Sequence, residues 1–107
     1  GTVSVTLDGT TYNFNFKSNG SPKGAGSNGS VDGYLYRNGM RLRADDDTKY
    51  QIREYGGIKY LLNENGTIQK NKKDIKDSDG YYYCTKSTGE VTYGPSETSY
   101  KDSQKNK

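Results

Sequence analysis

The chain has 107 residues, with 16 basic and 13 acidic side chains, a formal net charge of +3, one cysteine and no histidine or tryptophan. The missing histidines exclude an imidazole base, a histidine-containing zinc site and a Ser-His-Asp or Cys-His nucleophile pair, and the single cysteine excludes an internal disulfide and a cysteine cluster around a metal. No apolar run approaches the ~20 residues of a membrane-spanning helix, so we expect no membrane insertion. We also expect no metal and no cofactor.

Tyrosine takes the place of much of the usual aliphatic core. Val, Leu, Ile and Phe together make up only 15 residues, whereas there are 11 tyrosines. Such a low content of core residues is typical of disordered chains, but the net charge is too small to keep this chain expanded. We therefore expect some mobile segments and an ordered part that is held together by aromatic rings.

Residues 1–16 predict an N-terminal β-hairpin. Polar and apolar residues alternate on both sides of the Asp8-Gly9 pair. The apolar positions are Val3, Val5, Leu7, Tyr12, Phe14 and Phe16. Strict alternation around an Asp-Gly turn is the strongest local signal for a hairpin.

The composition changes abruptly after this hairpin. Residues 17–31 are rich in Gly and Ser, which predicts a flexible loop between two units. Residues 32–94 carry short strand signals separated by turns, without any sustained helical period. Residues 95–107 contain Tyr100 but no aliphatic residue, which predicts a mobile tail.

Glycines recur along the chain at a nearly constant interval. Gly9, Gly33, Gly57 and Gly80 are separated by 24, 24 and 23 residues, and an aromatic strand signal follows each of them. An isolated hairpin cannot bury its own face, and stacking several hairpins solves that problem. We therefore predict an all-β fold: an array of short β-hairpin repeats of about 24 residues, β-solenoid-like, with no substantial helix. The alternative is that the glycine spacing is accidental.

The segment GIKYLLNENGTIQKN resembles the cell-wall-binding repeats of Gram-positive surface proteins, the family that includes choline-binding and glucan-binding repeats. Those repeats run Gly-x-Trp-Tyr-Tyr-Leu-Asn-x-Asn-Gly-x-Met. The matching positions here are Gly57, Tyr60, Leu62, Asn63, Asn65 and Gly66, with Ile68 in place of Met. The segment DGYYYCTKSTGEVTYG is similar, with Tyr81-Tyr82-Tyr83 in place of Trp-Tyr-Tyr and Cys84 at the Leu position.

The resemblance implies binding of a ligand by aromatic side chains. Choline-binding members form an aromatic cage around a quaternary ammonium, and here Lys59 and Lys72 occupy tryptophan positions where they would repel a cation. Tyrosines can instead stack on sugar rings. The candidate ligand-binding residues are Tyr34, Tyr36, Tyr60, Tyr81, Tyr82, Tyr83 and Tyr93. The alternative is that these tyrosines form only the core of a small β-array, with Tyr82 on the face opposite its neighbours.

Three polar features have simpler explanations than a dedicated site. Residues 32–78 carry ten basic and eight acidic side chains, a balance of charge that is too even for a nucleic-acid surface. The alternative is a basic edge that binds anionic wall polymers. The spacing of Asp45-Asp46-Asp47 matches no calcium loop, so a polar turn is expected. Cys84 is expected to be a small buried hydrophobe.

The sequence therefore favours a non-catalytic module of an extracellular bacterial surface protein, located at the cell wall. Its expected partner is a cell-wall polymer or another glycan. The alternative is a protein–protein interaction module, as in an adhesin or stalk. Binding of nucleic acid through tyrosine stacking is a third and weaker hypothesis, so no nucleic-acid partner is expected.

Overall fold

The computed structural model describes residues 2–16 and 26–105 and divides into two compact units, one ending at Leu42 and the other beginning at Arg43. Strands account for 53% of the structure and helix for 4%, which confirms the all-β class. The strands form three separate antiparallel sheets, and no solenoid is detected in the described part of the chain, so the hairpin array is not confirmed. No helix within residues 2–16 and 26–105 is long and apolar enough to cross a membrane.

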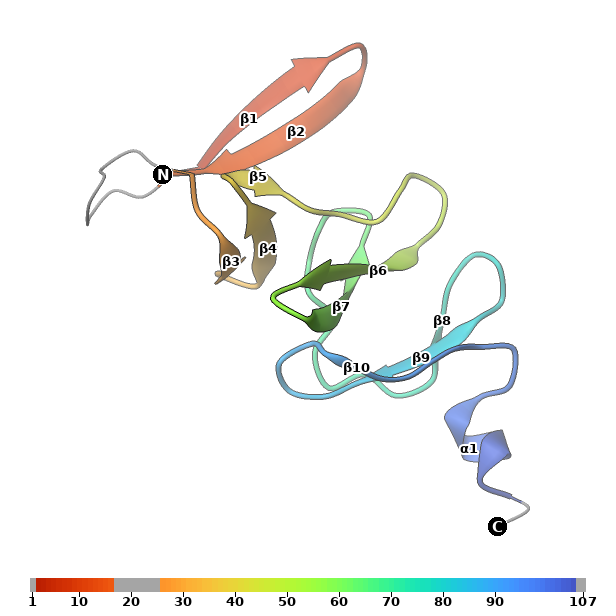
Figure 1. Ribbon diagram of the computed structural model, residues 1–107. Helices are drawn as coiled ribbons and strands as arrows, with labels where there is room; N and C mark the ends of the chain where they lie inside the picture. Colours follow the sequence, from red (N-terminus) through yellow and green to blue (C-terminus); the bar gives the residue numbers. More distant parts are fainter. Residues whose placement is uncertain (1, 17–25, 106–107) are drawn as a thin grey trace. The chain divides into compact units, whose positions relative to one another are not determined.

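The first unit holds a five-stranded sheet with the order β1-β2-β5-β4-β3 (Figure 1). Its strands are β1 (Thr2–Leu7), β2 (Thr10–Asn15), β3 (Gly29–Val31), β4 (Tyr34–Arg37) and β5 (Met40–Arg41). Strands β1 and β2 form the predicted hairpin, and both residues of its Asp8-Gly9 turn have positive φ, at 49° and 79°. This backbone twist matches the twist of the strands, which is why Asp-Gly suits the turn.

The Gly/Ser-rich segment departs from the expected loop. Residues 17–25 lie outside the described residues, but Gly26 pairs with Phe16 and β3 pairs with β4. The Ser27 N–H donates to the Asn15 carbonyl at 2.9 Å, and the Gly39 N–H donates to the Ser27 carbonyl at 2.8 Å. Backbone hydrogen bonds thus incorporate a segment whose side chains carry no strand pattern.

The second unit contains two sheets and a short helix (Figure 1). Strands β6 (Tyr50–Tyr55) and β7 (Ile58–Asn63) form a hairpin, and the other sheet has the order β10-β9-β8. The remaining elements are β8 (Ile75–Lys76), β9 (Tyr82–Thr85), β10 (Val91–Ser96) and α1 (Tyr100–Ser103). Strand β7 also bridges to Glu90 and Ile68, so it connects the hairpin to the rest of the unit.

The core of the second unit is aliphatic rather than a seam of phenol rings. Leu61 and Leu62 on β7 are fully buried, as is Ala44, whereas Tyr60, the preceding residue of β7, is only half-buried. Consecutive buried leucines mean that β7 is covered on both of its faces. Cys84 is buried with an exposed fraction of 8%, as expected for a small hydrophobe.

Three of the four regularly spaced glycines share one conformation. Gly9, Gly33 and Gly57 are each the second residue of a two-residue hairpin turn, with φ of 79°, 85° and 78°. Gly80 also has positive φ but lies in the longer connection between β8 and β9. The interval therefore coincides with tight hairpin turns at three of its four positions.

The C-terminal segment also departs from the expected mobile tail. Strand β10 continues to Ser96, and α1 follows it. The Asp74 carboxylate accepts hydrogen bonds from the backbone N–H groups of Tyr100 at 2.6 Å and Lys101 at 3.1 Å. The Ser99 hydroxyl caps the helix by accepting from the Asp102 N–H. A carboxylate distant in sequence therefore holds a helix that composition alone does not predict.

Candidate functional site

A pocket of about 390 Å³ in the second unit is lined by three tyrosines. Tyr50 begins β6, Tyr81 immediately precedes β9, and Tyr83 lies within β9. Pro95 on β10 adds a further apolar surface. This volume lies within the range of small-ligand pockets, and the phenol rings give it broad apolar walls with polar rims. We call it the tyrosine pocket.

Asp77 organises the turn that presents two of these tyrosines. One of its carboxylate oxygens accepts from the backbone N–H groups of Asp79 at 2.9 Å and Tyr81 at 3.0 Å. The other carboxylate oxygen accepts from the Tyr83 hydroxyl at 2.8 Å. A single carboxylate thus fixes both the start of β9 and the orientation of the buried phenol.

Burial raises the pKa of Tyr83 well above its ordinary value of 10.0, and the hydrogen bond to Asp77 and its negative charge raise it further. Tyr83 has an exposed fraction of only 5%. The folded protein therefore keeps this phenol neutral under alkaline conditions in which the unfolded chain loses the proton.

Stability should fall more steeply with alkaline pH in the wild type than in Tyr83→Phe. Because the folded-state pKa is raised, this stabilisation is complete below pH 10 and decreases by about 1.4 kcal/mol per pH unit above it. At neutral pH the variant should lose about 1 kcal/mol with the hydrogen bond. Urea unfolding between about pH 8 and pH 11 measures both effects. Parallel pH profiles for the two proteins would show that folding does not raise the pKa of Tyr83.

Several polar groups on the tyrosine pocket are available to a ligand. Neither the Tyr50 nor the Tyr81 hydroxyl has a hydrogen-bond partner among the described residues, and the exposed Asp79 carboxylate has no such partner either. Gln51 uses its oxygen to accept from the Asp45 N–H and from Arg53, which leaves its amide N–H groups as donors. The pocket therefore combines free donors and acceptors with aromatic faces.

The Asp45–Asp47 segment is a polar turn, as the sequence predicts. The Asp45 carboxylate pairs with Arg53 at 3.1 Å, and the Asp46 carboxylate pairs with Arg43 at 2.9 Å. No group of acidic or sulfur side chains suited to a metal ion occurs in the described residues. The Thr48 hydroxyl donates to the Asp45 carbonyl at 2.6 Å, which closes the turn next to the tyrosine pocket.

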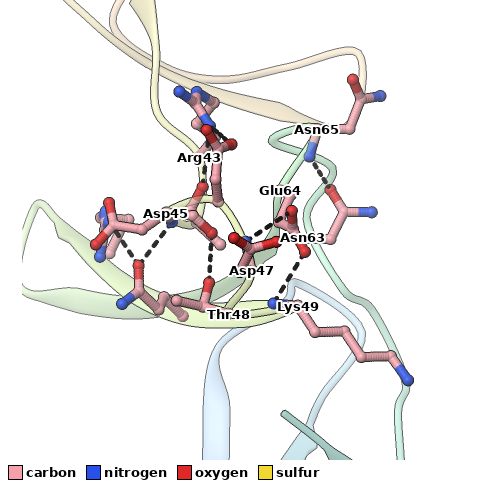
Figure 2. Close-up of polar contacts among 12 residues, drawn as sticks. Arg43, Asp45, Asp47, Thr48, Lys49, Asn63, Glu64 and Asn65 are labelled. Carbon is pink, nitrogen blue, oxygen red and sulfur yellow. Dashed lines mark hydrogen bonds and ion pairs between the residues drawn. The ribbon is translucent and has the colours of Figure 1, made fainter. Parts of the chain in front are cut away.

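Glu64, the residue directly after β7, forms hydrogen bonds with the turn that contains Asp47 and Lys49 (Figure 2). Its two carboxylate oxygens accept from the backbone N–H groups of Asp47 and Lys49, each at 3.1 Å. Asp47 and Lys49 both have positive φ, at 68° and 69°, which costs conformational energy in non-glycine residues. Because Thr48 and Tyr50 line the tyrosine pocket, Glu64 positions one wall of it from outside.

Glu64→Gln is expected to destabilise the protein by about 1 kcal/mol and to weaken binding at the tyrosine pocket. The amide keeps one acceptor oxygen but turns an N–H group toward the second backbone donor. Urea unfolding gives the stability change, and the matched control is Glu97→Gln, which neutralises an exposed carboxylate without a partner in the described residues. Equal effects of the two substitutions would show that the Glu64 carboxylate does not stabilise the turn.

The two candidate tyrosines of the first unit face a cation of the chain itself. The Arg41 guanidinium lies 3.7 Å from the centre of the Tyr34 ring and 5.7 Å from that of Tyr36. It also donates to the Tyr36 hydroxyl at 3.1 Å, and Tyr36 has an exposed fraction of only 2%. Internal cation–π contacts therefore occupy the surfaces that the repeat resemblance assigns to a ligand.

The other candidate tyrosines do not line the tyrosine pocket. Tyr60 is half-buried on β7, and Tyr82 lies under the Lys76 ammonium at 5.6 Å. The Tyr93 hydroxyl donates to the Thr98 carbonyl at 2.7 Å, and its ring packs edge-on against Tyr100 at 5.2 Å. Of the seven candidates, only Tyr81 and Tyr83 line the tyrosine pocket, whereas Tyr34 and Tyr36 meet at Arg41.

The sequence did not identify six of the eight residues that line the tyrosine pocket. Tyr50 belongs to no copy of the repeat motif, and Asp77 and Asp79 read only as turn residues before Gly80. The available signal was the Asp77-Ser78-Asp79 segment, which Gly80 separates from three tyrosines, because acidic residues near aromatic ones suit ligand recognition.

Comparison with protein-family models, with curated proteins and with solved structures finds no significant match to this chain. The resemblance to cell-wall-binding repeats therefore stays a prediction from the sequence.

Proposed function

We propose that the protein is a non-catalytic glycan-binding module whose ligand is a cell-wall polymer or a related carbohydrate, and that it works at the surface of a bacterial cell. The observation that carries this proposal is the tyrosine pocket, which joins three phenol rings to unpaired polar groups. A sugar ring has an apolar C–H face that stacks on aromatic rings, and hydroxyls at its edge that need donors and acceptors.

The polar groups of the pocket match those hydroxyls. The Asp79 carboxylate accepts hydrogen bonds, the Gln51 amide donates them, and the free Tyr81 hydroxyl does either. Asp77 and Asp79 line the pocket, whereas no lysine or arginine among the described residues does. A neutral or cationic sugar therefore suits it better than an anionic one.

Retention on purified cell wall tests the proposal, with Tyr81→Ala as the key variant. Tyr81 is 36% exposed, so its removal should leave the fold intact while weakening retention about tenfold or more. The control is Tyr55→Ala, which removes a half-buried ring that does not line the pocket. Retention should survive about 0.5 M salt and be competed by soluble sugar. Equal retention of both variants would contradict a site at the tyrosine pocket.

The second candidate is a protein–protein interaction module, such as an adhesin or stalk domain. One observation favours it: the apolar side of the first unit is open to solvent, with Val3 49%, Leu7 60% and Met40 38% exposed. Val3 and Leu7 lie on the edge strand β1, where exposed apolar residues can pair with another protein. This function predicts no retention of the wild type on purified cell wall.

Our proposal of a glycan-binding module includes the hairpin repeats predicted from the sequence. The shared turn conformation at Gly9, Gly33 and Gly57 supports hairpin units of about 24 residues as the building block. A parent protein with further copies of this unit would present several glycan sites, which raises affinity through multivalency.

A further inference from the structure

The second unit has another cavity, of about 450 Å³, that shares no residue with the tyrosine pocket. Its walls come from the segment before β8, from strands β9 and β10, and from α1. The lining includes Asn71, Lys72, Lys73, Thr85, Thr92 and Tyr100, together with the buried Cys84. We call it the lysine cavity, and no acidic side chain in the described part of the chain lines it.

The two lysines are not engaged in the ion pairs of the described structure. Neither Lys72 nor Lys73 forms an ion pair with a described residue, whereas Lys86 pairs with Glu90 at 2.6 Å. The nearest acidic group on the same segment is Asp74. Its carboxylate is engaged by the backbone N–H groups of Tyr100 and Lys101. Lys72 and Lys73 therefore line the cavity without an ion-pair partner among the described residues.

The backbone that carries the lysines is fixed. The Lys72 N–H donates to the Thr85 hydroxyl at 3.0 Å, and the Thr85 N–H returns a bond to the Lys72 carbonyl at 2.9 Å. Asn71 and Asp74, which bracket the pair, both have positive φ, at 54° and 53°. Conformations of this kind cost energy in non-glycine residues and concentrate at functional sites.

We propose that the lysine cavity binds a phosphate group, and that this second site lets the module hold an anionic wall polymer independently of the glycan in the tyrosine pocket. Lysine recognises phosphate as a point charge, and neutral donors complete the contact. The Asn71 amide and the Thr92 and Tyr100 hydroxyls supply such donors at the cavity wall. The phosphate comes either from a free ion or from a phosphodiester polymer.

Amide chemical-shift titrations of the whole chain distinguish these sources, with inorganic phosphate and poly(glycerol phosphate) as the two probes. Both probes should shift the amides of residues 71–73 and 85, and sodium chloride at equal ionic strength should not. Lys72→Gln/Lys73→Gln should weaken both affinities about tenfold or more. Binding of inorganic phosphate alone would support a small-anion site and overturn the polymer as the ligand.

A charge-matched control separates a site from general electrostatics. Lys59→Gln/Lys70→Gln removes the same charge from two exposed lysines outside the cavity. If both double variants lose affinity equally, the attraction is diffuse and the proposal is wrong. Tyr81→Ala should keep phosphate binding, and the Lys72/Lys73 variant should keep binding of neutral glycans, so the two proposed sites fail independently.

Discussion

Gly94→Ala is expected to destabilise the second unit by about 3 kcal/mol or more, because a β-carbon at this position has no room. It would lie 2.1 Å from the Tyr82 carbonyl oxygen and 3.1 Å from the Tyr83 Cα. Both are backbone atoms of β9, so strand β10 must move away from β9. The φ of +98° adds strain for any other residue. Urea unfolding followed by tyrosine fluorescence measures the loss.

Gly57→Ala is the matched control for that substitution. Gly57 also has positive φ, at +78°, but nothing lies within 4 Å of an added β-carbon. It should therefore cost only about 1 kcal/mol from backbone strain. The difference between the two variants isolates the close approach of β10 to β9. Similar losses would mean that the strands do not lie as close as the structure places them.

Leu61→Ala is expected to cost between about 2 and 5 kcal/mol. Leu61 is fully buried on β7, and its backbone joins separate parts of the second unit. Its N–H donates to the Gly89 carbonyl at 3.2 Å, and its carbonyl accepts from Gln69 at 2.8 Å. The cavity left by the truncation should therefore weaken the packing of β7 against the segment around Gly89. The shift of the urea midpoint measures the cost.

Leu7→Ala provides the comparison at the surface. Leu7 is 60% exposed at the end of β1, so the same truncation there should change stability by less than about 0.5 kcal/mol. A cost for Leu61→Ala as small as that for Leu7→Ala would show that β7 is not the centre of the core.

The sequence predicted those parts of the fold that local chemistry encodes. The hairpin of β1 and β2 follows from alternation around Asp8-Gly9, and the turn after Asn63 follows from its Asn and Gly residues. The three-sheet arrangement was not predictable in this way. It depends on bridges such as Leu62 to Ile68, which joins the hairpin strand β7 to a residue outside its hairpin.

The candidate site was only partly predictable for a related reason. Alternation on β9 correctly separated Tyr83 from Tyr82, because neighbours on a strand point to opposite faces. The partner Tyr50 reaches the tyrosine pocket through a turn whose conformation is set by Glu64. Arg41 covers Tyr34, and no pattern in the sequence distinguishes that internal contact from a ligand cage.

The proposed function requires that the tyrosine pocket of the second unit binds a glycan. Amide chemical-shift mapping with soluble fragments of cell-wall glycan is the decisive measurement. We expect saturable shifts at Tyr50, Asp79 and Tyr81, and these shifts should disappear in Tyr81→Ala. Saturable binding with shifts confined to other residues, or no binding by the folded wild-type chain at all, would contradict it.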